Sequence, residues 1–248
     1  MTQDRVWLSS YPEGVPADID PDQYPSLVAM LEESFARFGS RTAFSFMGKD
    51  LSYAQMDEQS RQLAAYFQSL GLAKGERIAI MMPNVPQYPV TVAAILRAGY
   101  VVVNVNPLYT ARELEHQLRD SGAEAIVILE NFCHTLEEVI DHCPVRHVVV
   151  ASMGDLLGFW YGRWISFAVR HLAKMVPAYR LPLSGPLGAR QVVSFRQALA
   201  EGGARPLKPS QATPDSVAFL QYTGGTTGLS KGAVLTHRNV IAAILQAE

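Results

Sequence analysis

This sequence of 248 residues has few cysteines and no excess of positive charge. Cys133 and Cys143 are the only cysteines, and 21 Lys and Arg residues stand against 23 Asp and Glu residues, for a formal net charge of −2. A nucleic-acid-binding domain usually concentrates basic residues on one surface. The charge balance therefore predicts no nucleic-acid partner, and the 48% of hydrophobic residues is typical of an α/β domain.

Metal-binding spacings are also missing. The stretch FCHTLEEVIDHCPVRH brings Cys133, His134, His142, Cys143 and His147 close together in the sequence. It contains no C-x-x-C or H-x-x-x-H pair, which would hold two ligands in tetrahedral geometry. We therefore expect no metal site here, and interpret the cysteines as reduced thiols near the ends of a short helix.

The first residues, MTQDRVWLSSYPEGVP, lack a basic segment followed by an apolar core and a small-residue cleavage site. This pattern predicts no secretory signal and a cytoplasmic location. No internal repeat is visible along the chain.

Short apolar runs alternate with helical patterns up to about residue 150. RIAIMMP, YVVVNVNP, AEAIVIL and RHVVV are typical of buried strands, and PQYPVTVAAILRAG and TARELEHQLRDSG of the helices between them. Such alternation predicts right-handed crossovers and a mostly parallel sheet with helices on both faces.

Local signals mark several boundaries. An amphipathic helix is expected over 26–38 with Gly39 at its end, followed by a hairpin over 42–53. Ser52 with Gln55, and Thr110 with Glu113, form capping-box patterns that predict two helix starts.

The pattern weakens over 151–209, where proline and glycine are frequent, and this segment is expected to be an insertion or linker. Within it, a helix over about 159–176 has Arg163, Arg170 and Lys174 on one stripe. The opposite arc is apolar: Trp164, Ile165, Ala168, Val169, Leu172, Met175 and Val176. The charges argue against a membrane-spanning helix. They fit a helix lying at a membrane surface through Arg163, Trp164, Arg170 and Lys174, or a surface helix that packs the apolar arc on its own domain.

The stretch YTGGTTGLSKGAVLTH combines glycines, threonines and one lysine between two predicted strands. Glycines let backbone N–H groups approach an anion closely, threonine hydroxyls donate hydrogen bonds, and the lysine adds positive charge. We therefore predict a polyphosphate-binding loop within 220–233, formed by Tyr222, Thr223, Gly224, Gly225, Thr226, Thr227, Gly228, Leu229, Ser230, Lys231 and Gly232.

Two alternatives explain this loop less well. An ordinary hairpin is usually closed by two residues and has no use for Lys231. A P-loop requires glycine directly before the lysine and a helix after it. Here Ser230 precedes the lysine, and the following run, GAVLTH, is typical of a strand.

At these residues the sequence resembles the AMP-forming acyl-CoA synthetases of the adenylate-forming superfamily. LQYTGGTTGLSKG matches the phosphate-loop signature of that family at every constrained position. The stretch over 104–140 and LTHRN after the loop are most similar to bacterial long-chain fatty-acid CoA ligases. The resemblance extends over essentially the whole chain.

The resemblance implies a two-step ligase with a fatty acid, ATP and coenzyme A as substrates and Mg²⁺ as cofactor. The fatty carboxylate would attack the α-phosphate of ATP and release pyrophosphate, after which coenzyme A would displace AMP. Thr223 corresponds to a threonine that lies near the metal in this family.

The resemblance also implies that the chain, 1–248, is an N-terminal portion of the adenylation domain. No motif for adenine, ribose or the adenylation lysine occurs in it, so we expect no catalytic residue in this portion and no activity from it alone. The alternatives are a non-catalytic nucleotide-binding or membrane-binding module, and an acyl-adenylate-forming ligase with another acceptor.

Overall fold

The computed structural model describes residues 5–181, 185–187, 190–223 and 230–247. An eight-stranded sheet has the order β10-β9-β4-β3-β5-β6-β8-β7, and β1 and β2 form a separate hairpin. The six central strands run parallel, and the edge strands β10 and β7 are antiparallel to their neighbours. The predicted mostly parallel sheet is confirmed. The strands are β1 (Thr42–Phe46), β2 (Lys49–Ser52), β3 (Arg77–Met81), β4 (Val101–Asn104), β5 (Ala125–Leu129), β6 (His147–Ala151), β7 (Gly185–Leu187), β8 (Arg190–Ser194), β9 (Val217–Thr223) and β10 (Lys231–Thr236).

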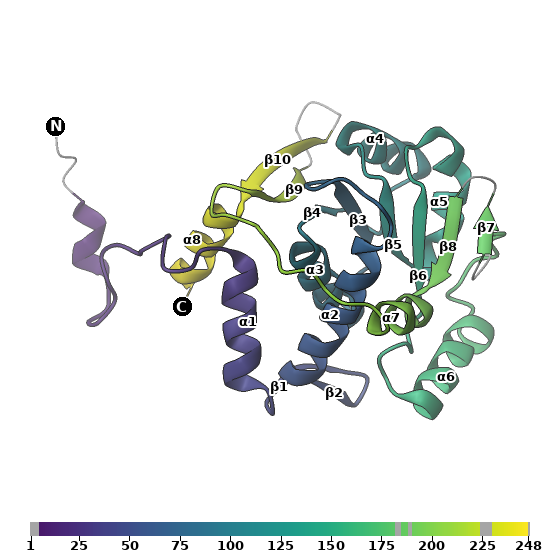
Figure 1. Cartoon of the computed structure of the whole chain (residues 1–248), viewed down its shortest axis with the longest axis horizontal. Coiled ribbons are helices and arrows are strands. Elements are labelled where there is room, and N and C mark those ends of the chain that lie inside the picture. The colour runs from purple at the N-terminus through teal and green to yellow at the C-terminus, as the bar shows by residue number, and fades with distance from the viewer. Residues whose placement is uncertain (1–4, 182–184, 188–189, 224–229, 248) are drawn as a thin grey trace.

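Helices cover both faces of the sheet (Figure 1). One layer contains α1 (Leu27–Phe38), α2 (Tyr53–Gln68), α3 (Gln87–Ala98) and α7 (Phe195–Gly203), and the other contains α4 (Ala111–Ser121) and α5 (Cys133–Val139). The remaining helices are α6 (Phe159–Phe167), α8 (His237–Ala247), the 3-10 helices η1 (Val6–Ser10), η2 (Glu130–Phe132) and η3 (Ile140–His142), and the π-helix η4 (Ala168–Leu172).

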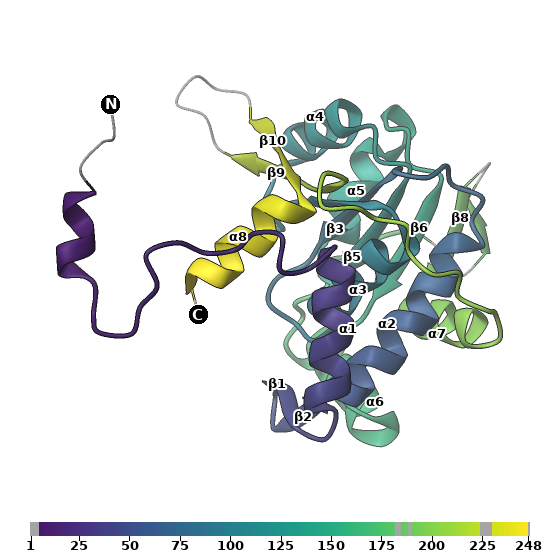
Figure 2. The same cartoon turned by 60° about the vertical axis from the view of Figure 1, so that its left-hand side comes forward.

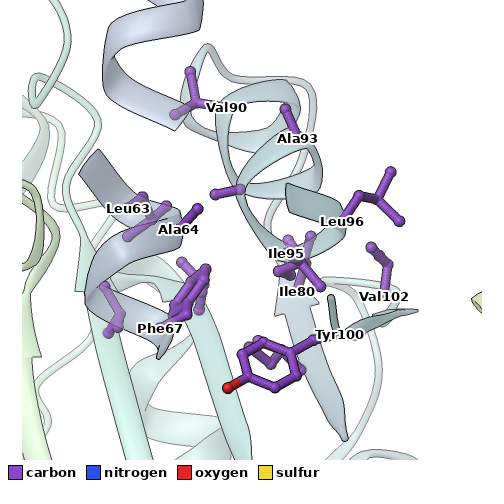
Figure 3. Packing of buried hydrophobic residues seen from close by; sticks show 14 of the residues in the cluster. Leu63, Ala64, Phe67, Ile80, Val90, Ala93, Ile95, Leu96, Tyr100 and Val102 are labelled. Atoms are coloured by element: carbon purple, nitrogen blue, oxygen red, sulfur yellow. The ribbon is translucent and has the colours of Figure 1, made fainter. Parts of the chain in front are cut away.

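Alternation along the strands divides the core into two halves. In β3, Ile78 and Ile80 face the α2–α3 layer, whereas Ala79 and Met81 face α4. Figure 3 shows Ile80 among side chains from α2, α3 and the neighbouring strands. A sheet covered on both faces needs apolar residues at every position, which explains the continuous apolar runs in the sequence.

The predicted helix starts are confirmed. The Ser52 hydroxyl accepts a hydrogen bond from the Gln55 N–H at 3.2 Å, and the Gln55 side chain accepts one from the Ser52 N–H at 2.9 Å. Thr110 and Glu113 form the equivalent box at the start of α4. The predicted hairpin before α2 is confirmed as β1 and β2.

The connections that follow β3 and β4 lead to opposite faces of the sheet. The loop after β3 leads to α3 on one face, and the loop after β4 leads to α4 on the other. Two such loops open a crevice at the carboxyl ends of the strands, where ligands bind in open α/β sheets. β3 lies between β4 and β5, so the strand order reverses between β3 and β5, which is the topological switch point of the sheet.

The segment 151–209, where the sequence suggests an insertion or linker, supplies β8 to the central sheet and α7 to the α2 layer. The strand is only five residues long and follows a stretch rich in proline and glycine, so its pattern is weak. The expected helix over 159–176 consists of α6 and the π-helix η4, and it ends before Lys174, which has φ of 53°.

Helix α8, the last helix of the described residues, packs beside α1. Figure 2 shows α8 next to the start of α1, with η1 set away from the sheet. The Leu27 N–H donates a hydrogen bond to Nδ1 of the buried His237, at 3.0 Å. Burial lowers the pKa of His237, so its ring is neutral and can accept this hydrogen bond.

Candidate functional site

The predicted phosphate loop connects β9 to β10. Lys231 lies opposite Thr223 in the antiparallel register, and Gly232 lies opposite Tyr222. The predicted loop residues Gly224, Gly225, Thr226, Thr227, Gly228 and Leu229 lie outside the described residues. Tyr222, Thr223, Ser230, Lys231 and Gly232 are described, and they form the two legs of the hairpin.

Thr223 and Lys231 form the outward-facing end of the hairpin. Both side chains are exposed, and they come from paired positions of β9 and β10. Within the described part of the chain, Lys231 forms no ion pair. A hydroxyl and an ammonium group are therefore available side by side to a solvent-borne anion.

Tyr222, next to Thr223, points the other way and is buried. Its hydroxyl donates a hydrogen bond to Oδ2 of Asp120, the tenth residue of α4, at 2.5 Å. Burial, and then the Asp120 carboxylate, raise the pKa of Tyr222 far above its usual range. The phenol is therefore protonated at physiological pH and acts as a hydrogen-bond donor.

Gly232 is required by the ring of Tyr222. A Cβ at this position would lie 3.0 Å from Cε2 and 3.1 Å from Cζ of the tyrosine, closer than side chains normally approach. A glycine in a strand often marks such a close approach. This contact explains the glycine that follows the lysine in the loop signature.

Gln221 fixes the same leg from the opposite face of the sheet. Its Oε1 accepts a hydrogen bond from Nδ2 of Asn104 at 2.9 Å, and the Asn104 Oδ1 accepts one from the Tyr88 hydroxyl at 3.0 Å. The second leg has its own contact, because Nε2 of His116 on α4 lies 3.2 Å from the Ser230 carbonyl oxygen. Both ends of the loop are thus attached to the domain.

A crevice of about 600 Å³ opens beside the first leg. It lies at the carboxyl ends of β3, β4 and β9, and its lining includes Asn84, Tyr88, Asn104, Asn106, Tyr109 and Tyr222. A second cavity of about 600 Å³, which Lys74 and Tyr100 help to line, opens toward the amino-terminal ends of the strands. The first crevice is at the carboxyl edge of the parallel strands, the edge at which ligands bind in open α/β sheets.

Sequence reasoning missed this crevice and the contacts to α4. One signal was available, because MMPN and NVNP place asparagines at the end of a buried strand or within three residues of it. The contacts of Asp120 and His116 had no such signal, since both residues look like ordinary surface positions of an amphipathic helix.

The predicted membrane-surface residues have different surroundings. Arg163 and Trp164 on α6 and Lys174 after η4 are exposed. Arg170 is instead paired with Glu130, whose side chain is 1% exposed, and donates a hydrogen bond to the Tyr179 hydroxyl at 3.0 Å. Of the predicted apolar arc, Ile165 and Val169 are buried in a small cluster with Leu157. Part of the predicted apolar arc therefore packs on the domain, and part of it is exposed.

The exposed face of α6 is aromatic. Phe159, Trp160, Trp164 and Phe167 are each more than half exposed, and Trp160 is 81% exposed. The helix also touches the β1–β2 hairpin through the Tyr161 hydroxyl, which donates a hydrogen bond to the Met47 carbonyl at 3.0 Å. None of the helices in the described ranges is long and apolar enough to span a bilayer.

Cys133 and Cys143 are free thiols buried at the start of α5 and just after η3. Burial raises the pKa of Cys133 to about 12 and that of Cys143 to about 11, so neither is a reactive thiolate. The described residues contain no group of three or more His, Cys, Asp and Glu side chains placed to hold a metal ion.

A profile of the family described as AMP-binding enzyme matches residues 31–248. The chain is 51% identical to a long-chain-fatty-acid–CoA ligase of Escherichia coli O157:H7 over 98% of its length, and 33% identical to one of Bacillus subtilis strain 168. It spans 42% of the length of each of these relatives.

Solved structures show the same architecture. A long-chain-fatty-acid–CoA ligase from Archaeoglobus fulgidus matches 96% of this chain and 41% of its own, with a TM-score of 0.70 and 26% identity. An anthranilate CoA ligase in complex with anthranoyl-AMP matches 89% of this chain and 37% of its own, with a TM-score of 0.68 and 19% identity, which bears on the fold alone.

Proposed function

The chain belongs to the AMP-binding enzyme family, and on that premise we propose that it is the phosphate-binding part of an AMP-forming long-chain fatty acid–CoA ligase. The observation that carries the proposal is the paired Thr223 and Lys231 at the end of a firmly held hairpin. The crevice of about 600 Å³ at the carboxyl ends of β3 and β4 lies beside this hairpin and supports the same assignment.

The whole ligase would activate a carboxylate that does not react with thiols by itself. A carboxylate oxygen forms a bond to the α-phosphorus of ATP while the bond to the bridging oxygen breaks, and pyrophosphate leaves. The thiol sulfur of coenzyme A then attacks the acyl carbon of the adenylate and loses its proton to solvent, and AMP leaves with the bonding electron pair. The products are acyl-CoA, AMP and pyrophosphate.

Lys231 and the loop act on the leaving group in this proposal. Negative charge accumulates on the β- and γ-phosphates as pyrophosphate departs, and a fixed ammonium and fixed N–H and hydroxyl donors stabilise that charge. The proposed phosphate-binding residues are those of the loop signature from Tyr222 to Gly232, including those outside the described residues.

The surroundings of Thr223 fit a role beside Mg²⁺. This ion keeps several waters and binds substrate phosphates, so it needs only one or two protein oxygens. The Thr223 side chain is exposed at the end of β9 and provides one such oxygen. When bound, Mg²⁺ would neutralise part of the phosphate charge.

Exchange between ATP and labelled pyrophosphate, with a long-chain fatty acid, tests this function in the whole ligase. Lys231→Ala should lower the exchange rate on the order of 10²-fold, because one donor to the developing charge is lost. Lys208→Ala is the matched control, since Lys208 is also exposed but its backbone is hydrogen bonded to Gln68 of α2, outside the hairpin. Equal exchange rates in the two variants would exclude Lys231 from the phosphate site.

A second proposal concerns α6 and a lipid surface. The observation in its favour is the exposed row of aromatic side chains, with Arg163 and Lys174 exposed nearby. Aromatic rings at the acyl boundary and cations at headgroup level are typical of a helix at a membrane interface. Arg170 belongs to an internal ion pair and is left out of this surface.

Co-sedimentation with phosphatidylglycerol vesicles tests the second proposal. Replacing Arg163 and Lys174 with glutamine should weaken binding by about 1 kcal/mol for each cation, and raising the salt concentration should weaken it further. Trp160→Ser should also weaken it, because an exposed indole no longer enters the interface. Sedimentation equal to that of the parent in all these variants would contradict a lipid-binding role.

A further inference from the structure

The two legs of the phosphate hairpin are held by one face of α4. His116 and Asp120 are four residues apart on this helix, so their side chains lie on the same side of it. His116 contacts the carbonyl of Ser230 on the second leg, and Asp120 accepts the hydrogen bond of Tyr222 on the first. Neither residue belongs to the loop signature.

The Tyr222 contact is well suited to fix a position. The tyrosine is 8% exposed, and its hydrogen bond to a carboxylate is 2.5 Å long. Hydrogen bonds to charged groups are stronger than neutral ones, and a poorly solvated environment strengthens them further. The ring also lies against Gly232, so it sets the distance between the legs as well.

The supporting helix is itself immobilised. Leu114 and Leu118 have no exposed surface, and Nε2 of Gln117 donates a hydrogen bond to the Asn104 carbonyl at 2.7 Å. A capping box closes the start of the helix. A hairpin attached to α4 is therefore attached to the centre of the sheet.

We propose that His116 and Asp120 are positioning residues of the phosphate site, which set where Thr223 and Lys231 stand by holding Ser230 and Tyr222. The inference rests on the proposed function of the hairpin. A catalytic charge displaced by about 1 Å can lose much of its effect, so a group that touches no substrate still controls the rate.

The structural half of the inference is tested by hydrogen exchange on the chain described here. Asp120→Ala should accelerate amide exchange in peptides covering 219–236. Arg119→Ala is the matched control, because Arg119 is the adjacent residue of α4, is largely exposed and pairs with Glu115 on the same helix. Asp120→Asn should restore protection, since its amide oxygen can accept the same hydrogen bond.

The functional half is tested by pyrophosphate exchange kinetics in the whole ligase. Asp120→Ala should raise the KM for ATP about tenfold without changing the KM for the fatty acid, because displaced Thr223 and Lys231 would lose the order of one hydrogen bond to the charged phosphates. A merely structural role would reduce the active fraction and lower kcat with both KM values unchanged. The double variant Tyr222→Phe/Asp120→Ala should match either single variant, because both remove the same contact.

The outcomes separate the two proposals. Exchange kinetics identical to the parent in Asp120→Ala, with faster hydrogen exchange, would overturn the positioning role while leaving the proposed function intact. Unchanged hydrogen exchange in this variant would overturn the anchor itself. A parent ligase without pyrophosphate exchange would refute the proposed function, and the hydrogen-exchange comparison would then decide whether α4 holds the hairpin.

Discussion

The β9–β10 hairpin and helix α6 are attached to the same domain by different means. Directed polar contacts hold the hairpin at several points, and the side chains at its end, Thr223 and Lys231, are polar and exposed. Helix α6 is held mainly by a small apolar cluster around Ile165, with one hydrogen bond from Tyr161 and an ion pair that follows the helix, and it exposes aromatic rings.

These two kinds of attachment fit different functions. Directed hydrogen bonds fix atoms to a geometry, which a site for a reacting phosphate requires. An aromatic surface has no single required geometry, because apolar burial is non-directional. An aromatic surface can therefore bind a lipid interface in many orientations, whereas a lysine that is displaced from a reacting phosphate no longer stabilises its charge.

The largest effect should come from the support of the hairpin. Leu118→Ala removes a fully buried side chain from α4 and should lower the free energy of unfolding by about 2 to 5 kcal/mol. Trp160→Ala on α6 should change it by less than about 0.5 kcal/mol, because the indole is 81% exposed. Urea unfolding measures both, and a similar loss in the two variants would erase the contrast between the regions.

Two arginines of the α6 region give the next largest contrast. Arg170→Met should cost about 2 to 3 kcal/mol, because it leaves the buried Glu130 charge without its partner. The cost is below that of a fully buried pair, since the Arg170 side chain is 35% exposed.

Arg163→Met is the matched control for charge. It should leave the unfolding free energy nearly unchanged but weaken sedimentation with anionic vesicles. Arg170→Met should show the opposite pattern once its folding is confirmed by circular dichroism. A loss of vesicle binding in both variants would return Arg170 to the lipid surface that the sequence predicts.

A smaller effect is expected where α6 meets the domain. Gly162 lies against the backbone of Gly154, and a Cβ at Gly162 would be 2.0 Å from the Gly154 carbonyl oxygen. Gly162→Ala should therefore displace α6 and cost about 1 to 3 kcal/mol, the usual range for overpacking. Arg163→Ala, at the next position, should neither displace the helix nor lower its stability in this way. Equal melting temperatures of the two variants would contradict the close contact between Gly162 and Gly154.

The smallest effects concern pH, and their signs differ between the regions. Burial lowers the pKa of His237, directly after β10, below the ordinary value of 6.5. The unfolded chain then binds more protons as the pH falls, so the stability from this group is present above pH 6.5 and lost below it. Burial raises the pKa of Asp155, near α6, to about 6, and its contribution is present below pH 3.8 and lost as the pH rises through 6.

Unfolding measured at pH 5 and pH 7.5 separates these contributions. The stability difference between the parent and His237→Gln should shift in favour of the variant at the lower pH. The difference between the parent and Asp155→Asn should shift in favour of the variant at the higher pH. If both variants had the same dependence of unfolding free energy on pH as the parent, the burial of His237 and of Asp155 would have no effect on stability.

Most of the fold could be predicted because its signals are local. Capping boxes such as Ser52 with Gln55 need only four residues, and parallel strands are visible as apolar runs. β8 was missed because its short run stands beside prolines and glycines. The signature indicates the phosphate loop, but the acceptor for Tyr222 is 102 residues away, a pairing that no local pattern encodes.

The pairing of β9 with β4 also has a kinetic consequence. Val102 faces Phe219 across this ladder, whereas β3 and β4 join residues that a single helix separates. Closing a longer loop costs more chain entropy, and distant pairings form slowly. We therefore expect the sheet around β3 to assemble first and the phosphate hairpin to dock late, so that the part of the chain proposed to act on ATP is the last to become native.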